Sequence, residues 1–373
     1  MIRKYTIFLL LITAAALSAA VTEVKLSYKK VILENHFLTL EFLPDSLGRL
    51  DQIQLKSSGK CLLLPRTLTR VSVDPLYGFY RNNSFGLGEN FWKNYVADRD
   101  GKSRITRPNQ QSIIFENNWY GGLAVNVQRK ITLHADETIL TCEAEVFNRN
   151  QKKNFFLAPW YAFSPAEAEN TKLLIPSKGG AKNHVLGNVK YVKYDSIVDG
   201  PSGLYCPARN WTATLYPAEK VALAIIIPEK EFFPDGAFYT WHGKDGNINY
   251  RSMEVILNKS LLAPLTKRKF SCMLAVFYGM DDIKDITGST AVDARLADNK
   301  LTLILSPARK LPAGKITVSV KDSMAEKYAE IKTEELSAGR KYEFSFDTEY
   351  KKISKITGKL PDGSTFDLLD INN

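Results

Sequence analysis

The sequence predicts an all-β fold in which a large antiparallel sandwich is followed by a smaller one. Apolar and polar residues alternate with a period of two in most apolar stretches, which is typical of half-buried strands. Turn-forming pairs such as Asp235-Gly236 and Asp245-Gly246 separate these stretches at intervals that suit a sandwich. The one stretch with a helix-like apolar spacing beyond about two turns is 324–331.

The first twenty residues are typical of a secretory signal peptide. Arg3 and Lys4 precede an apolar run at 7–17, and the small residues 18–20 follow it. We therefore expect cleavage after Ala20 and a periplasmic or secreted mature chain. A helix needs about 20 apolar residues to span a bilayer, and no later stretch approaches that length, so we expect no integral membrane segment after cleavage.

Residues 21–288 are predicted to form the larger sandwich. Apolar residues alternate with polar ones at 38–42, 140–146 and 270–278, whereas 221–227 is apolar on both faces, as in the central strand of a two-layer core. Cys142 and Cys272 fall inside such strands. In an oxidising compartment the four cysteines allow three disulfide pairings, and plain buried thiols are the alternative.

Residues 289–373 are predicted to form the smaller sandwich. Short alternating runs separated by Pro and Gly turns are typical of an immunoglobulin-like or fibronectin-like domain; they recur at 301–305, 316–320, 342–346, 353–357 and 366–369. This part contains no Trp and no Cys, and no residue in it suggests chemistry, so we expect a packing or spacing module. The small residues 288–290 are the predicted linker.

Charge and motifs exclude several functional classes. The net charge is +10, but the basic residues are scattered, which does not favour a nucleic-acid partner. The zinc-hydrolase pattern HExxH, the CxxC pair and the serine-hydrolase pattern GxSxG are absent from the sequence. The glycine spacings of phosphate-binding and dinucleotide-binding loops are absent too. We therefore expect no cofactor and no metal.

The segments 33–50, 59–63 and 129–163 and the strand around Glu254 follow one another in an order that resembles the strand order of galactose mutarotase-like proteins. The segment 33–50, with its Pro44 and Gly48-Arg49 turn, and the segment 59–63 are similar to the first hairpin of that superfamily. Stretches at 129–163 follow its strand order, and the strand around Glu254 resembles its terminal glutamate strand. The resemblance covers residues 30–285 and implies a β-supersandwich with a sugar-sized groove on one face.

This resemblance implies a catalytic role for Glu254. In mutarotases of this kind a glutamate takes the proton of the anomeric hydroxyl, and a histidine protonates the ring oxygen. Here the residues at 158–161 are Ala-Pro-Trp-Tyr where the histidine is expected. If a hairpin turns at 245–246, His242 lies about five residues, or roughly 16 Å, along the ladder from the partner of Glu254. The alternative for Glu254 is a buried, ion-paired carboxylate.

Aromatic residues also favour a sugar ligand. Trp and Tyr stack on the apolar faces of sugar rings, while Arg, Asn and carboxylates bind the hydroxyl groups. The candidate substrate-binding residues are Arg81, Trp92, Trp160, Tyr161, Trp241 and His242. Some of the tryptophans would instead fill the core.

Two functional classes remain. The first is a secreted carbohydrate-binding protein, accessory to glycan metabolism, whose partner is an oligosaccharide or polysaccharide. The second is a carbohydrate-active enzyme, namely an epimerase, lyase or glycoside hydrolase that uses Glu254. A surface structural protein without a ligand is a third hypothesis.

Overall fold

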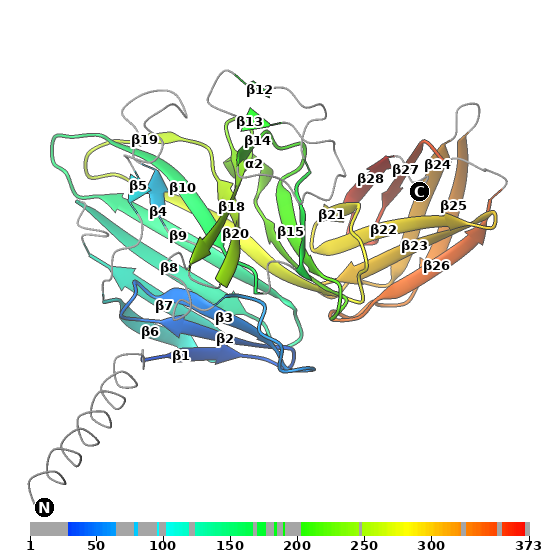
Figure 1. Ribbon diagram of the computed structural model, residues 1–373, viewed down its shortest axis with the longest axis horizontal. Helices are drawn as coiled ribbons and strands as arrows, with labels where there is room; N and C mark the ends of the chain where they lie inside the picture. The colour runs from blue at the N-terminus through cyan, green and yellow to red at the C-terminus, as the bar shows by residue number, and fades with distance from the viewer. Residues whose placement is uncertain are drawn as a thin grey trace, which may run out of the picture.

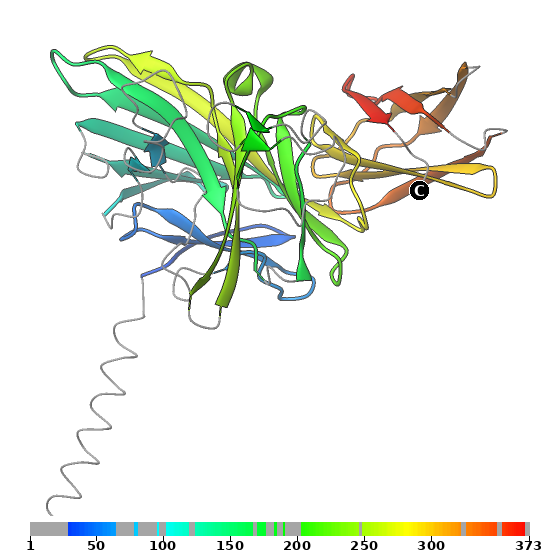
Figure 2. The same ribbon diagram turned by 45° about the horizontal axis from the view of Figure 1, so that its top comes forward.

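The protein is built almost entirely from antiparallel strands, which confirms the predicted fold class. The computed structural model describes residues 29–64, 78–80, 95–96, 102–118, 124–166, 170–176, 183–184, 189–190, 203–245, 248–321, 326–348 and 353–369. A large sandwich and a smaller one lie side by side along the long axis of the molecule (Figures 1 and 2).

A three-stranded sheet begins the large sandwich. Its order is β1-β2-β3, with β1 at Val31–Glu34, β2 at Leu38–Leu43 and β3 at Arg49–Leu55. The alternation predicted at 38–42 is confirmed, because Leu38, Leu40 and Phe42 are buried. Phe42 packs on Phe115 of the next sheet, with the ring centroids 5.3 Å apart.

An eight-stranded sheet forms one main layer of the large sandwich. Its order is β11-β15-β16-β20-β9-β8-β7-β6. The strands are β6 (Arg104–Asn109), β7 (Ser112–Asn117), β8 (Val125–Leu133), β9 (Ile139–Asn148), β11 (Lys172–Leu174), β15 (Trp211–Tyr216), β16 (Val221–Ile226) and β20 (Lys267–Tyr278). Every residue of β16 is buried, as its uniformly apolar sequence predicted. The short helix α2 (Glu229–Phe232) follows it.

A nine-stranded sheet forms the other main layer. Its order is β12-β13-β14-β17-β18-β10-β4-β5, and β19 also pairs with β10. The strands are β4 (Gly78–Tyr80), β5 (Tyr95–Val96), β10 (Phe155–Phe163), β12 (Asn183–His184), β13 (Val189–Lys190), β14 (Gly203–Tyr205), β17 (Ala237–Asp245), β18 (Ile248–Ile256) and β19 (Ser260–Leu262). Apolar side chains from all three sheets form one core.

Two cysteines face each other within that core. Cys142 of β9 is paired with Cys272 of β20 in the ladder, and both residues are buried free thiols. Burial, together with the neighbouring Cys142, raises the pKa of the Cys272 thiol well above its usual range. The buried-thiol alternative therefore describes this pair.

The smaller sandwich consists of two four-stranded sheets. One has the order β21-β22-β23-β26, with β21 at Asp285–Thr287, β22 at Thr290–Ala297, β23 at Lys300–Pro307 and β26 at Tyr342–Asp347. The other has the order β25-β24-β27-β28, with β24 at Gly314–Lys321, β25 at Glu326–Thr333, β27 at Lys355–Lys359 and β28 at Thr365–Leu369. Their facing side chains form a second core.

The segment with the helix-like apolar spacing, 324–331, is not helical over the residues that the structure describes. Residues 326–333 form β25, which is an edge strand paired only with β24. None of its side chains is fully buried. An edge strand with so little burial shows no regular two-residue apolar period, so the sequence pattern was misleading there.

The junction between the sandwiches is not an open linker. Gly288 has a φ of +56° and turns the chain between β21 and β22, and the next two residues, Ser289 and Thr290, are buried. A third apolar cluster contains Trp211 and Phe277 of the large sandwich together with Ile286 and Ile304 of the small one. The predicted linker is therefore a packed hairpin turn.

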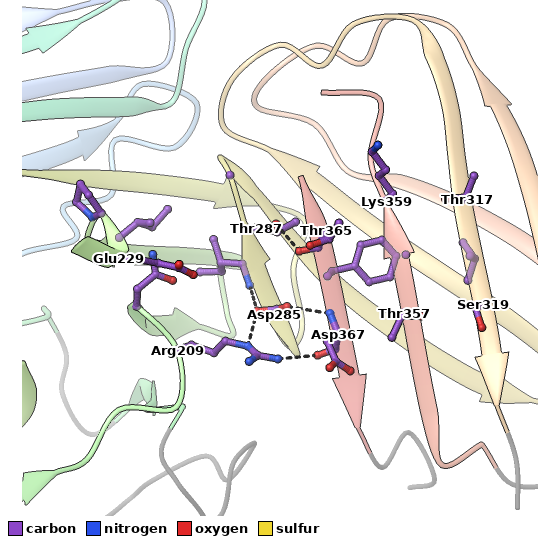
Figure 3. A pocket seen from close by; sticks show the side chains of 18 of the residues that line it. Arg209, Glu229, Asp285, Thr287, Thr317, Ser319, Thr357, Lys359, Thr365 and Asp367 are labelled. Carbon is purple, nitrogen blue, oxygen red and sulfur yellow. Dashed lines mark hydrogen bonds and ion pairs between the residues drawn. The ribbon is translucent and has the colours of Figure 1, made fainter. Parts of the chain in front are cut away.

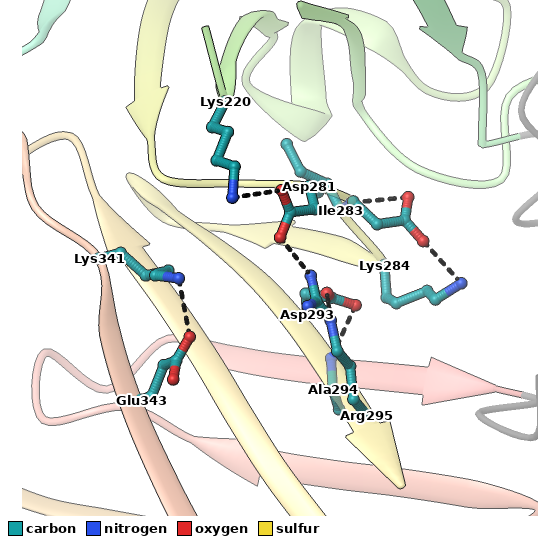
Figure 4. A network of polar contacts seen from close by, with 10 residues as sticks. Lys220, Asp281, Ile283, Lys284, Asp293, Ala294, Arg295, Lys341 and Glu343 are labelled. Carbon is teal, nitrogen blue, oxygen red and sulfur yellow. Dashed lines mark hydrogen bonds and ion pairs between the residues drawn. The ribbon is translucent and has the colours of Figure 1, made fainter. Parts of the chain in front are cut away.

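Charged side chains line the same junction (Figure 4). Asp281 lies 3.7 Å from the ammonium group of Lys220 and 3.1 Å from the guanidinium of Arg295. Arg295 also contacts Asp293 at 3.2 Å. Burial, and next the nearby Asp282 carboxylate, raise the pKa of Asp293 to about 6, although Arg295 lowers it.

None of the helices that the structure describes is long and apolar enough to cross a bilayer.

Candidate functional site

Glu254 occupies the centre of the nine-stranded sheet. Its strand, β18, lies between β17 and β10, where its neighbours in the ladder are Tyr239 and Ala162. Because successive residues of a strand point to opposite faces, the flanking Met253 and Val255 enter the inter-sheet core. Glu254 therefore lies on the face directed away from that core, and the small Ala162 beside it adds little bulk.

Three polar or aromatic side chains surround the Glu254 carboxyl group. The Ser252 hydroxyl, two residues away on the same strand, donates a hydrogen bond to it. Trp160 of β10 meets the ring of Tyr239 of β17 edge to face, with centroids 6.3 Å apart and an interplanar angle of 88°. Only 6% of Glu254, 7% of Tyr239 and 2% of Trp160 is exposed. The site is thus a carboxyl group enclosed by aromatic rings.

The environment of Glu254 changes its protonation state. Burial raises its pKa to about 8, although the hydrogen bonds of Ser252 and Trp160 favour the charged form. Burial, followed by the charge of Glu254, also raises the pKa of Tyr239. At neutral pH Glu254 is therefore mostly the neutral acid, which can donate one hydrogen bond and accept others. The base expected from the resemblance would have to be ionised.

Trp160 and Tyr161 do not line one groove, although they are adjacent in sequence. Trp160 lies on the face of Glu254, where it forms a buried wall. Tyr161 points into the inter-sheet core, where its ring meets Phe270 edge to face at 6.2 Å and its hydroxyl lies beside Cys272. This position does not fit the substrate-binding role predicted for Tyr161, because neighbouring residues of a strand face opposite ways.

The backbone register places two further candidates. Trp241 is paired with Ser252, one step of two residues from Tyr239, and His242 is the next residue along β17. The structure describes the backbone of Trp241 and His242 but not their side chains. Arg81 and Trp92 lie outside the described residues altogether.

The predicted distance between His242 and Glu254 was wrong. The partner of Glu254 is Tyr239, so the offset is three residues rather than five. Asp245, which was predicted to lie in the turn, is still paired with Ile248, so the ladder extends one residue further than predicted. A shift of the turn by one residue changes the sum of paired residue numbers by two, which accounts for the difference.

Ser252 and Tyr239 were not predicted as site residues. The two-residue period of a strand starting from Glu254 points to Ser252, and the correct hairpin register points to Tyr239. Over the described ranges, no three His, Cys, Asp or Glu side chains gather closely enough to hold a metal ion.

No family model matches the sequence, and no curated protein matches it either. Similar solved structures include a galactose mutarotase related enzyme from Lactobacillus acidophilus, with 12% identity and a TM-score of 0.45 over 69% of this chain and 100% of that one. A galactose mutarotase-like protein from Clostridium acetobutylicum has 11% identity and a TM-score of 0.46 over 67% of this chain and 95% of that one. A TPR-domain containing protein from Parabacteroides distasonis has 15% identity and a TM-score of 0.49, over 69% of this chain and 48% of that one.

Carbohydrate-active enzymes are also among the similar structures. Galactose mutarotase-like proteins, which the sequence resembles, are thus among the structural neighbours of the chain. At these identities the likeness concerns the fold and assigns no site residue.

Proposed function

We propose that the protein binds a carbohydrate on the face of the nine-stranded sheet that carries Glu254. The observation that carries the proposal is the Glu254 carboxyl group enclosed by Trp160 and Tyr239 and hydrogen-bonded by Ser252. Sugars combine apolar ring faces with hydroxyl groups, so they need aromatic surface next to a carboxyl or hydroxyl partner. A neutral acid serves both directions of hydrogen bonding to such a hydroxyl group.

The setting of this activity is part of the same proposal. The basic, apolar and small segments of residues 1–20 support export to the periplasm or the medium. In that compartment an oligosaccharide or polysaccharide is the expected partner. The protein would act as an accessory to glycan metabolism, presenting or holding a glycan for other proteins.

A second candidate function rests on the raised pKa of Glu254. A carboxylic acid that stays protonated near neutral pH is what general acid catalysis at a glycosidic oxygen requires. Burial of Glu254 gives it that property. The alternative function is therefore a carbohydrate-active enzyme, an epimerase, lyase or glycoside hydrolase, in which Glu254 delivers a proton.

Two substitutions at Glu254 separate these functions. A glycan array identifies a ligand of the mature chain, and calorimetry then compares the variants. Glu254→Leu removes hydrogen bonding at nearly constant volume, so we expect binding about tenfold weaker or worse. Glu254→Gln keeps a donor and an acceptor but cannot transfer a proton, so binding should persist while any turnover stops.

The control and the contradicting results are equally specific. Glu143 is an exposed carboxylate on β9, with 58% of its side chain accessible, and Glu143→Leu should leave binding unchanged. Equal affinity of the wild type and Glu254→Leu would show that the sugar binds elsewhere. Product formation from the bound glycan that ends in Glu254→Gln would favour the enzyme over the binding protein.

A further inference from the structure

A cavity lies between the two sandwiches. It has a volume of about 780 Å³ and is bounded by residues 209–210, 226–229 and 273 of the large sandwich and by β21, β24, β25, β27 and β28 of the small one. Figure 3 shows Arg209 and Glu229 on one side and the hydroxyl side chains of the small sandwich on the other. Pockets that enclose small ligands have volumes of roughly 300–1,000 Å³.

The wall contributed by the small sandwich is a row of side chains across four strands. Ser319 of β24 is paired with Tyr328 of β25 on one side and with Thr357 of β27 on the other. Thr357 is in turn paired with Asp367 of β28. Residues paired in this way lie on the same face of a sheet, and all four line the cavity.

Tyr328 stands at one end of this row and is 78% exposed. It is the largest of the exposed large hydrophobic side chains among the described residues. Two further hydroxyl residues of the same wall also line the cavity, namely Thr317 on the neighbouring strand β24 and Thr365 on β28. An accessible aromatic ring next to several hydroxyl groups is the surface that a sugar chain stacks and hydrogen-bonds on.

Polar contacts link the two sandwiches at the opposite end of the row. Arg209 lies 3.6 Å from the Asp285 carboxylate and donates a hydrogen bond of 3.3 Å to the carbonyl oxygen of Asp367. Asp285 also accepts hydrogen bonds from the Trp211 indole and from the Asp367 backbone amide, both at 3.1 Å. These bonds join the two sandwiches at the base of the cavity, so its shape exists before a ligand binds.

The charges of the cavity favour a neutral ligand. Arg209 is offset by Asp285, and Asp367 is offset by Lys355 at 3.0 Å. The remaining charged side chain of each sign on the lining, Lys359 and Glu229, is exposed to solvent. A phosphorylated, sulfated or strongly acidic chain would find no excess of positive charge here.

We propose that this cavity binds a segment of a neutral oligosaccharide or polysaccharide, with Tyr328 as the stacking platform. The chain runs along the row from Tyr328 past Ser319 and Thr357 toward the Arg209–Asp285 contact, which marks the closed end. This site shares no residue with the Glu254 site and does not depend on it. A protein that holds a long glycan gains from two contact points, because the second event is then intramolecular.

The test titrates neutral hexasaccharides (malto-, cello-, laminari- and xylo-hexaose) into the full mature chain by calorimetry. The wild type and Glu254→Leu are each combined with Tyr328→Ala, Tyr328→Phe and the cavity-filling Thr357→Tyr. Lys332→Ala on the same strand, outside the lining, is the control. Thermal unfolding of each variant shows that it is folded. Because Tyr328 is exposed, Tyr328→Ala should fold normally even where Thr357→Tyr does not.

We expect at least one hexasaccharide to bind about tenfold more weakly to Tyr328→Ala and Thr357→Tyr, while Tyr328→Phe and Lys332→Ala stay within about threefold of the wild type. The same loss should occur in the Glu254→Leu background. If every hexasaccharide binds Tyr328→Ala as it binds the wild type, or none binds the wild type, the cavity is not a sugar site. Binding that is lost in Glu254→Leu but unaffected by Tyr328→Ala would overturn this inference and leave the proposed function intact.

Discussion

Replacing Glu254 by Gln should change the pH dependence of stability more than the stability at low pH. Gln has nearly the shape of the protonated acid and keeps the contact with Ser252, but it does not titrate. In the wild type the folded-state pKa of Glu254 is about 8, against an ordinary value of 4.5. Because the pKa is raised in the folded state, the folded form binds the extra proton. The contribution of this proton to the free energy of unfolding is fully present below pH 4.5 and decreases as the pH rises from 4.5 to 8.

The size of the effect follows from that interval. Each pH unit inside it costs the wild type about 1.4 kcal/mol of unfolding free energy. From pH 5 to pH 7 the wild type should therefore lose about 2 to 3 kcal/mol relative to Glu254→Gln. All other titrating groups are common to both proteins, so they cancel in the difference.

Urea unfolding at pH 5, 6, 7 and 8, followed by tryptophan fluorescence, measures this difference. We expect the free energy of unfolding of Glu254→Gln to increase steadily relative to that of the wild type up to pH 8. Above that pH the difference should be constant. Glu143→Gln, on the exposed face of β9, is the control and should follow the wild type throughout. A constant difference between wild type and Glu254→Gln at all four pH values would refute the assignment of a neutral, buried acid.

Three further predictions concern the junction, the buried thiols and catalysis. Asp285→Ala removes the partner of several buried donors and should cost about 3 kcal/mol of unfolding free energy. The control Asp282→Ala removes a more exposed ion pair and should cost less than about 1 kcal/mol. Equal losses of stability in thermal unfolding would contradict the role of Asp285. Cys142 and Cys272 should resist thiol reagents until the chain unfolds, while the two partly exposed cysteines react in the native protein; rapid labelling of all four would show that the core opens. Polarimetry of fresh α-glucose should show no acceleration of anomer interconversion, because Glu254 is mostly protonated at neutral pH and no histidine occupies 158–161; fast relaxation that is abolished in Glu254→Gln would reverse this conclusion.

Local patterns predicted the strands well where burial is regular. The alternation at 38–42 and the uniformly apolar 221–226 report how many faces of a strand are covered, and both were interpreted correctly. At 326–333 the same reasoning failed, because no side chain of this edge strand is fully buried, so neither face requires a regular apolar pattern. Sequence periodicity reflects burial, so it does not predict a strand whose side chains are barely buried.

The site was predicted only in part, for two physical reasons. Trp160 and Tyr161 are adjacent in sequence, yet the pleat of β10 sends them to opposite faces. Tyr239 was missed because its position depends on where the hairpin turns, and an error of one residue there moves every partner. The cavity beside Tyr328 brings together segments more than 100 residues apart, so no local pattern could indicate it.

The apolar cluster shared by the two sandwiches stabilises their junction. Trp211 and Phe277 on one side and Ile286 and Ile304 on the other shield each other from water, so neither sandwich has a complete solvent-facing surface by itself. A chain cut after residue 288 would expose this apolar surface and aggregate instead of behaving as an independent domain. Recombination that exchanged the C-terminal sandwich for an unrelated one would have to replace the matching side chains in the same event. The two sandwiches therefore depend on each other for the burial of these side chains.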